Sequence, residues 1–225
     1  MSKLNAILEA ATHLFSKNGF KQTSMAELSR VTGAARGTIF HHFKNKEDLF
    51  LNILKNTQES ITSAFNEHKG RSSSKTGMEL VESAVYFYLN LALEKQDQFL
   101  MLHRHFPYQM AETNETCRQH LEAIYECLVG IFEEGVAAGI KDGTIQSRSA
   151  HNTALLLFAM VDGVARLNTY KLYQTGSLFP DLMEACRQML AGQAPDDIAD
   201  RPAGTAGSLP GQMKTTRDGH SAQNQ

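Results

Sequence analysis

Proline is almost absent from the first 191 residues of this 225-residue chain. Only Pro107 and Pro180 fall in that stretch, whereas Pro195, Pro202 and Pro210 follow it. Proline interrupts the interior of a helix because it lacks an amide hydrogen and its ring clashes with the preceding turn. A stretch this long with so few prolines can therefore form many uninterrupted helices.

Within that stretch the apolar residues recur mostly every three or four positions, the period of an amphipathic helix. No segment combines alternating apolar and polar residues with the turn residues of a hairpin. The sequence therefore predicts an all-α fold. Helical patterns cover residues 4–18, 24–31, 36–43, 45–65, 78–95, 97–105, 114–138, 148–173 and 178–191, and the polar residues 68–77, rich in Gly and Ser, predict a loop.

Composition excludes several classes of protein. Apolar residues make up 42% and charged residues 20%, values typical of a globular chain. The three cysteines are an odd number and lie too far apart for a disulfide framework. The longest apolar run, residues 154–161, is too short to span a bilayer, and the first helical pattern is amphipathic, unlike a signal peptide. We therefore expect a cytoplasmic protein with reduced thiols and no membrane partner.

The charges and the C-terminal segment suggest how the chain is divided. Residues 1–50 hold seven Lys and Arg against four Asp and Glu, and the remainder holds 15 against 20. A basic N-terminal part on an acidic remainder suits a DNA-binding protein, although charge fluctuations of this size are common. Residues 192–225 contain five Gly, three Pro and no aromatic residue. They bury too little apolar surface to offset chain entropy, so we expect a disordered tail.

Residues 24–43 are predicted to form two short helices around a glycine turn. Ser24 and Glu27 have the spacing of a capping box, which marks the start of the first helix. Gly33 ends that helix, because glycine readily adopts the left-handed conformation of a helix C-terminus. Ser29 supplies the small side chain that two tightly crossing helices need. The pair has the form of a helix–turn–helix.

The second of these helices has two contrasting faces. At 100° per residue, Ile39 and Phe43 lie together and are expected in the core. The opposite face presents Gly37, Thr38 and His41. A small, polar surface of this kind fits the major groove of DNA, and glycine permits a close approach of the backbone.

The order and spacing of residues 3–50 resemble the DNA-binding domain of TetR-family transcriptional regulators. The resemblance rests on the run GTIFHHFKNKEDLF at 37–50, preceded by AILEAATHLFSKNGF at 6–20 and by TSM at 23–25. It implies an N-terminal helix-turn-helix, three-helix DNA-binding domain at 1–47. A C-terminal helical domain for ligand binding and dimerisation would follow at 48–191.

The resemblance also implies which residues bind DNA. In the family, phosphates are contacted at helix N-termini and by a lysine at the start of the next helix, and base edges are contacted from the second helix of the pair. The matching residues of this chain are Thr23, Ser24, Arg36, Gly37, Thr38, His41, His42 and Lys46. The chain departs from the family at Phe40 and His42, which stand where tyrosines are frequent, and at Ala35, where serine is frequent. We expect Phe40 to pack in the interior. For His42, a phosphate contact and plain exposure both remain open.

The last two helical patterns predict a homodimer. One recognition helix contacts too few base pairs for useful specificity, so two-fold dimers are the usual solution. Residues 150–167 are apolar nearly all round and must be covered on several sides. By the resemblance, they and the last helix form a four-helix dimer interface through residues about 150–190; a single intramolecular core explains the pattern as well. The apolar stripe of the last helix comprises Phe179, Leu182, Met183, Cys186, Met189 and Leu190.

The middle helices are expected to form an effector pocket. Flexible methionines and flat aromatic rings suit an adaptable apolar cavity, although ordinary core packing is the better explanation for any single one of them. Pro107 is expected to break the helix beside this cluster. The candidate lining residues are Tyr86, Phe87, Phe99, Met101, His103, Phe106, Tyr108, Met110, Phe158 and Tyr170.

Enzymatic alternatives find little support in the sequence. His103 and His105 are two residues apart, so on a helix they diverge by about 200° and cannot share a metal. The sequence has neither paired Cys-x-x-Cys ligands nor the Glu-x-x-His of di-iron bundles. We therefore expect no catalytic residues, metal or cofactor.

The sequence predicts a ligand-responsive regulator, in particular a repressor. It would bind a pseudo-palindromic operator in double-stranded DNA as a dimer and be released by a small, largely apolar effector. The alternative is an architectural or division-type DNA-binding factor of the same fold that has no effector.

Overall fold

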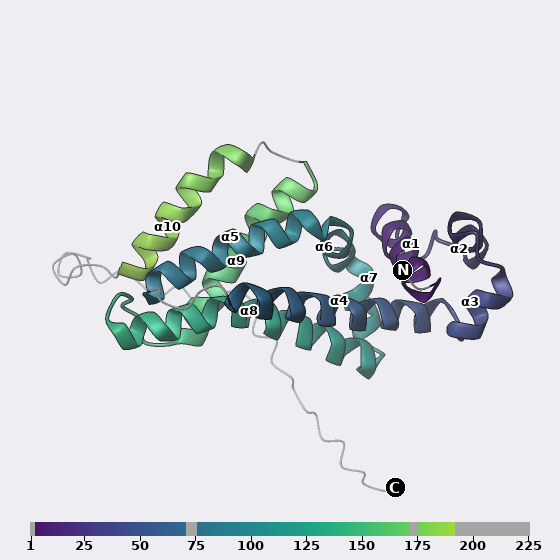
Figure 1. Ribbon diagram of the computed structural model, residues 1–225, viewed down its shortest axis with the longest axis horizontal. Coiled ribbons are helices and arrows are strands. Elements are labelled where there is room, and N and C mark those ends of the chain that lie inside the picture. Colours follow the sequence, from purple (N-terminus) through teal and green to yellow (C-terminus); the bar gives the residue numbers. More distant parts are fainter. Residues whose placement is uncertain (1–2, 71–75, 172–174, 192–225) are drawn as a thin grey trace, which may run out of the picture. The chain divides into compact units, whose positions relative to one another are not determined.

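The computed structural model describes residues 3–70, 76–171 and 175–191, and within these ranges it contains helices and no strand (Figure 1). The predicted all-α fold is thereby confirmed. In chain order the elements are α1 (Lys3–Asn18), α2 (Met25–Thr32), α3 (Arg36–His42), α4 (Lys46–Lys69), α5 (Gly77–Glu94), α6 (Gln96–Leu102), α7 (His105–Ala111), α8 (Glu115–Asp142), α9 (Ala150–Thr169), the 3-10 turn η1 (Thr175–Leu178) and α10 (Phe179–Ala191).

We call α1–α3 the head and α4–α10 the body. The described residues all belong to one packed unit, and the boundary expected between residues 47 and 48 falls inside α4. The disordered tail expected at 192–225 lies outside the described residues, as do positions 71–75 of the expected loop. None of the described helices has the length and apolar character needed to cross a membrane.

Helix boundaries in the head follow local capping chemistry. Ser24 begins α2 by accepting a hydrogen bond from the Glu27 amide at 3.1 Å. Gly33 ends α2 with φ at 66°, a left-handed conformation that glycine adopts without steric cost. Asn45 begins α4 by accepting from the Asp48 amide at 2.8 Å.

Pro107 does not end a helix, contrary to expectation. It is the third residue of α7, within the first turn, where an amide hydrogen would have no partner in the helix. The break comes earlier, because α6 ends at Leu102 and Arg104 has extended dihedral angles. The helix predicted over residues 97–105 is therefore two separate elements, α6 and the first residue of α7.

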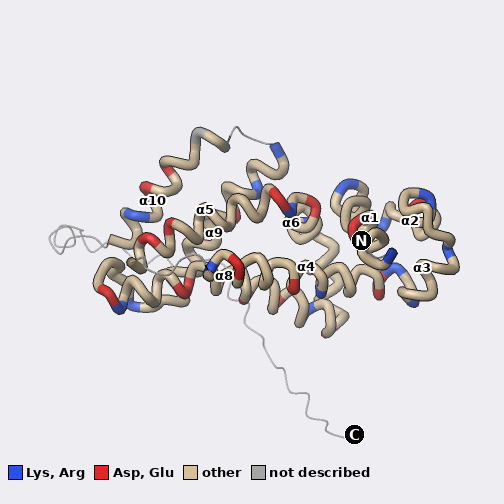
Figure 2. The backbone as a smooth tube through the Cα atoms, viewed as in Figure 1, with Lys and Arg blue, Asp and Glu red and all other residues tan. Residues whose placement is uncertain are grey.

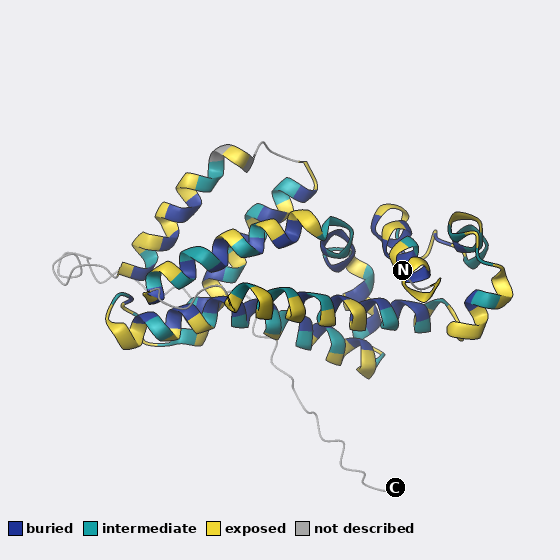
Figure 3. Ribbon diagram, in the orientation of Figure 1, coloured by how far each residue is buried: buried dark blue, intermediate teal, exposed yellow. Residues whose placement is uncertain are grey.

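The body is built around α8, which packs against α4, α5 and α9 (Figure 3). Helices α5 and α8 cross at very close range, because a Cβ atom placed on Gly77 would lie only 1.9 Å from the backbone nitrogen of Gly139. Further along the same two helices, the side chains of Val85 and Tyr88 on α5 and Phe132 on α8 are fully buried in the core.

The apolar stripe of α10 is largely covered by its own chain. Four of its six members are buried without any partner subunit, and the Gln146 amide donates to the Leu190 carbonyl at 2.9 Å. Those four side chains do not form the partner-facing surface expected of them, and the single-core explanation holds for them. They are Leu182, Met183, Cys186 and Leu190. On the neighbouring α9, by contrast, Leu155 and Leu156 are exposed, Leu156 to 59%.

Candidate functional site

Helix α3 carries an open face on a buried base. Ile39 and the following Phe43 are buried, as predicted. Gly37, His41 and His42 are exposed, while Thr38 is half-buried. The helix therefore packs through its apolar residues and is exposed along most of the rest of its surface (Figure 3).

Phe40 also lies on this open face. Its side chain is 49% exposed, so the expectation that it packs in the interior is wrong. The reason is helical geometry, because Ile39 already occupies the position that faces the core and the next residue is rotated away by 100°. His42 is exposed as well, and Arg36 is exposed at the beginning of the helix.

The turn before α2 separates two neighbouring candidates. Ser24 is exposed at the N-terminus of α2, where free backbone amides favour an anion. Thr23 is buried, and its hydroxyl donates to the Gly19 carbonyl at 3.0 Å. The Thr23 side chain therefore holds the turn together, whereas Ser24 faces solvent.

Lys46 is engaged inside the head. Its Nζ donates to the carbonyl oxygens of Phe20 at 2.7 Å and Thr23 at 3.0 Å, and it lies 4.4 Å from the centre of the Phe20 ring. Burial lowers the pKa of this lysine, and the charge of Glu47 opposes that shift. In this conformation Lys46 joins the start of α4 to the turn between α1 and α2.

Lysines and arginines outnumber acidic residues around α2 and α3 (Figure 2). Arg30 and Arg36 are exposed on these two helices, and Lys44 follows α3. Such a local excess of positive charge is what the phosphates of duplex DNA require, since the favourable field then lies where the backbone approaches.

Head and body meet through α1, α6 and α7. The Arg104 guanidinium donates to the carbonyl oxygens of Ser16 and Lys17 at the end of α1. Asp97 of α6 accepts from the Ser16 hydroxyl at 2.8 Å and contacts His13 at the same distance.

Phe106 completes this contact between head and body. Its ring stacks on that of Phe20, with centroids 3.8 Å apart, and meets Phe50 edge-on. Phe106 was expected in the effector pocket, but the structure places it in the contact between α7 and the head. The interface is thus partly polar and partly aromatic.

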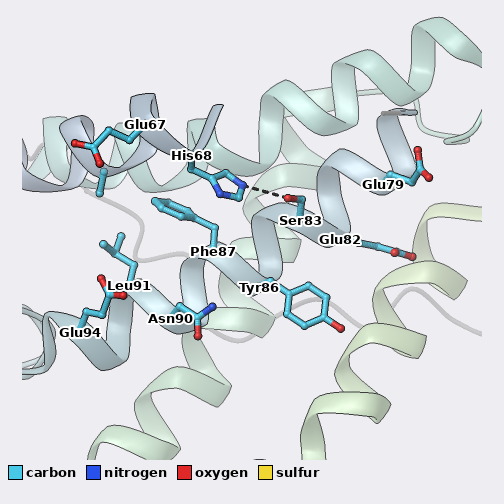
Figure 4. Close-up of a pocket in the computed structure, with 11 residues that line it drawn as sticks. Glu67, His68, Glu79, Glu82, Ser83, Tyr86, Phe87, Asn90, Leu91 and Glu94 are labelled. Atoms are coloured by element: carbon cyan, nitrogen blue, oxygen red, sulfur yellow. Dashed lines mark hydrogen bonds between the residues drawn. The ribbon is translucent and has the colours of Figure 1, made fainter. Parts of the chain in front are cut away.

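Two of the hollows that border α5 contain sequence candidates. The larger, of about 780 Å³, lies between α4 and α5 and is lined by Tyr86, Phe87 and His68 together with four glutamates (Figure 4). The His68 and Phe87 rings stack with centroids 4.5 Å apart. The four carboxylates belong to Glu67, Glu79, Glu82 and Glu94.

The smaller cavity, of about 320 Å³, lies between α5, α9 and the start of α10, and its size suits a small molecule. Its lining is mostly apolar. Tyr86 and Asn90 border both hollows. Sequence reasoning missed most of its members, because alanines and leucines on a helix carry no signal that separates a pocket from a core. They are Leu89, Ala92, Leu93, Val164, Ala165, Asn168, Thr169, Gly176 and Phe179.

The remaining candidate lining residues are scattered. Phe99, Met101 and Met110 are buried in the core, and Tyr170 is exposed near Arg166. The structure therefore brings only Tyr86 and Phe87 of the ten candidates to the two hollows beside α5.

A buried polar network crosses the body. Asp162 of α9 accepts from the Tyr88 hydroxyl at 2.7 Å and lies 3.1 Å from Nε2 of His103. Burial of Asp162 opposes ionisation, but the hydrogen bonds from His103 and Tyr88 and the nearby charges of His103 and Arg166 lower the pKa of this carboxyl below its usual value. His103 was a sequence candidate, whereas Asp162, which is 59 residues away, was not.

Two further candidates lie beside this network. The hydroxyls of Tyr108 and Tyr125 are hydrogen-bonded, and the ring of Phe158 lies between Tyr88 and Tyr125. Burial, followed by the hydrogen bond to Tyr108, raises the pKa of Tyr125. These residues form an aromatic wall around Asp162.

The described residues contain no cluster of three or more His, Cys, Asp or Glu side chains that could hold a metal ion. His103 points its Nε2 to Asp162, while His105 is exposed at the start of α7. The three cysteines are free thiols.

Comparison with known proteins agrees with the geometry of the head. Residues 7–53 match the family described as "Bacterial regulatory proteins, tetR family". The fatty acid metabolism regulator protein of Bacillus subtilis (strain 168) is 28% identical over 151 residues, which are 63% of this chain and 72% of that protein. The HTH-type transcriptional regulator AcrR of Shigella flexneri is 25% identical over 162 residues, 70% of this chain and 74% of that protein.

The whole described chain also has a known fold. The crystal structure of the transcriptional regulator FadR from Bacillus subtilis, in complex with stearoyl-CoA, matches with a TM-score of 0.67 at 19% identity, covering 83% of this chain and 98% of that one. The sequence matches are to regulators rather than enzymes. Taken with the helix–turn–helix of α2 and α3, they identify the chain as a transcriptional regulator of the TetR family.

Proposed function

We propose that this chain is a repressor that binds a pseudo-palindromic operator as a homodimer and is released by a small, largely apolar effector. The open face of α3, standing on the buried Ile39 and Phe43, is the observation that carries the proposal. A short helix presented in this way fits the major groove, and a second copy would occupy the next groove about 34–36 Å away.

The proposed DNA contacts divide by chemistry. Gly37, Thr38 and His41 would meet base edges, because they lie on the part of α3 that a major groove admits. Ser24 and Arg36 would bind phosphates, the first at a helix N-terminus and the second through its charge.

Three further residues complete the proposed contact set. His42 is exposed beside His41 and is assigned to a phosphate. Thr23 and Lys46 are already bonded within the head, so we assign them a shared task. They would fix the turn that presents Ser24, and Lys46 would add its charge to the phosphate field.

The proposed domains are the DNA-binding domain at 1–47 and the effector-binding and dimerisation domain at 48–191. The effector would bind in the body and favour a conformer in which the two α3 helices no longer match the half-site spacing. Such a shift requires different affinities of the effector for the two conformers. The contacts of Arg104 and Asp97 with α1 offer a route from body to head.

Homodimerisation is assigned to α9. Its exposed stripe includes Leu155, Leu156, Ala159 and Gly163, whose small members allow a second helix to approach closely. The apolar cavity between α5 and α9 favours a regulator with an effector over an architectural factor without one.

The proposal can be tested with the purified full chain and the DNA that flanks its own coding sequence. Fluorescence anisotropy at moderate salt is expected to show binding of a palindromic fragment by a dimer. Selection from random DNA with Thr38→Ala and His41→Ala is expected to give altered consensus sequences. A wild-type chain without preference for any fragment, or variants that return an unchanged consensus, would refute the assignment.

A further inference from the structure

The apolar cavity between α5 and α9 and the polar network of Tyr88, His103 and Asp162 share the helices α5 and α9. Ala92 lines the cavity and follows Tyr88 by four residues on α5, while Ala165 lines it and follows Asp162 by three residues on α9. Residues with these spacings share a helix face and lie about one turn apart. The Asp162 carboxylate therefore lies about one helical turn beyond the cavity, next to two buried alanines with very short side chains.

The network has unused hydrogen-bonding capacity. Both hydrogen bonds of Asp162 end on Oδ1, and Oδ2 of this 21% exposed side chain has no hydrogen-bond partner among the described residues. The His103 side chain is only 6% exposed, yet its Nδ1 is buried without a partner. A buried polar atom is normally hydrogen-bonded, and a neutral His103 ring whose Nε2 donates to Asp162 leaves Nδ1 as an acceptor. Nδ1 and the partly exposed Oδ2 of Asp162 are therefore suited to a ligand that supplies donors.

The electrostatics of the surroundings favour a cation. The pKa of Asp162 lies below its usual value, so this side chain is a carboxylate at neutral pH. The larger hollow shares Tyr86 and Asn90 with the apolar cavity and has four glutamates in its own lining (Figure 4), of which Glu82 is paired with Arg187. Carboxylates grouped at the border of a cavity raise the local concentration of cations.

The aromatic side chains point the same way. The Tyr86 and Phe179 rings meet at the cavity with centroids 4.7 Å apart, and Tyr88 with Phe158 flanks Asp162. The negative faces of such rings attract ammonium groups. The basic groups of this region are His103, which bonds to Asp162, Arg187, which pairs with Glu82, and Arg166, which is exposed beside the ring of Tyr170.

We propose that the body binds an amphiphilic organic cation, with its apolar part in the cavity between α5 and α9 and its ammonium group against Asp162. This inference rests on the proposed function in that the cation would be the effector. It adds the chemical class of that effector, which an apolar cavity alone does not specify.

Three matched probes test the class of ligand. We would measure the melting temperature of the full chain with 4-phenylbutylamine, 4-phenylbutan-1-ol and 4-phenylbutyric acid, which share one apolar part and differ in charge. A ligand that binds the folded state raises the melting temperature by mass action. The amine is expected to bind about tenfold more tightly than the alcohol, and the acid not at all.

Variants assign the effect to Asp162. Asp162→Asn keeps the shape and both accepted hydrogen bonds, and it should remove the preference for the amine. Ala165→Leu should abolish the binding of both the amine and the alcohol by filling the cavity, which keeps the test valid if the first variant folds poorly. Glu115→Gln, which removes an exposed carboxylate at the start of α8, is the matched control and should change nothing.

Several outcomes would overturn the inference. Failure of the amine to stabilise the wild type would do so, as would an amine preference that survives in Asp162→Asn. Stabilisation by the acid or by stearoyl-CoA, without stabilisation by the amine, would reject the cation while the proposed regulator stands. Loss of sequence-specific DNA binding, by contrast, bears on the proposed function and not on the class of ligand.

Discussion

Nε of Arg104 lies 3.1 Å from the carbonyl oxygen of Ser16, so that a side chain of the body closes the C-terminal end of the first helix of the head. A second bond from Nη2 reaches the Lys17 carbonyl at 2.8 Å. Carbonyls in the last turn of a helix lack partners within the helix, and the negative end of the helix dipole also attracts a cation there. The preceding residue, His103, bonds to Asp162 on α9, so two consecutive residues connect α9 with α1.

Removal of this guanidinium is expected to loosen the head. Arg104→Met keeps an unbranched apolar stem and deletes the donors, and we expect a loss of about 1–3 kcal/mol in the free energy of unfolding. Amide hydrogen exchange should accelerate at the end of α1 and remain unchanged in the middle of α8. Arg118→Met, at an exposed arginine that donates to the Ala111 carbonyl, is the control. Unchanged exchange in α1 would show that Arg104 does not hold it.

Arg36 and Lys46 are expected to contribute differently to DNA binding. Arg36 is exposed, so Arg36→Ala should weaken binding to all sequences and reduce the slope of log affinity against log salt by about one, with an unchanged melting temperature.

Lys46→Ala should also weaken DNA binding and flatten its salt dependence. In addition it should lower the melting temperature, because the carbonyls of Phe20 and Thr23 lose their donor. Thermal unfolding and anisotropy titrations at several salt concentrations give both quantities. A Lys46 variant with wild-type thermal stability would contradict the bonding described here, and an unaltered salt slope in both variants would remove them from the phosphate contacts.

The head could be predicted closely because local chemistry defines it. Ser24, Gly33 and Asn45 set helix boundaries through capping and left-handed backbone, and these interactions involve residues within a few positions of one another. The open and buried faces of α3 follow from the 100° rotation per residue. Phe40 was misjudged because hydrophobicity outweighed this geometry, although Ile39 already filled the inward position.

The body could be predicted only in outline. Its helices follow from periodicity, but the polar network joins Tyr88, His103 and Asp162, which are separated by up to 74 residues. A sequence does not reveal which distant side chains meet inside a bundle. The same limit applies to Phe106, whose partner Phe20 lies in the head. Pro107 was taken as a helix breaker, whereas the first turn of α7 accommodates it.

His120 is expected to make stability depend on pH. Burial, and then the charge of Lys55, lower the pKa of this histidine, although Glu59 opposes the shift. Protonation is therefore easier in the unfolded chain, and the stabilising contribution is present above pH about 6.5 and lost as the pH falls through the lower folded pKa. Urea unfolding at pH 7.5 and 5.5 should show a smaller difference for His120→Gln than for the wild type. His105→Gln, at an exposed histidine, is the control and should keep the wild-type difference in stability between the two pH values. If His120→Gln also keeps that difference, His120 is not the cause of the pH dependence.

Two glycines should respond in opposite ways to the same substitution. A Cβ at Gly77 would collide with the backbone of Gly139, so Gly77→Ala should cost about 3 kcal/mol or more by forcing α5 away from α8. Gly130 lies within α8 with no atom within 4 Å of such a Cβ. Gly130→Ala should therefore gain about 0.5–1 kcal/mol, because alanine loses less backbone freedom on folding. Equal effects of the two substitutions in urea unfolding would contradict the close crossing.

The exposed stripe of α9 predicts how two copies associate. Leu156 is the most exposed large apolar residue among those described, and Leu155 lies beside it. A charge placed there would be buried in the dimer without a partner, so Leu156→Glu should convert the dimer to a monomer.

Sedimentation velocity would give the assembly state, with Leu4→Glu on the exposed face of α1 as the control. A monomer carries one α3. At high protein concentration the Leu156 variant should therefore bind an isolated half-site as tightly as the wild type does, but it should lose the preference for two correctly spaced half-sites. A variant that stays dimeric would move the interface away from α9. If the variant is monomeric but still prefers two correctly spaced half-sites, dimerisation is not needed for DNA recognition. The proposed mechanism, in which a dimer reads two half-sites, would then be wrong.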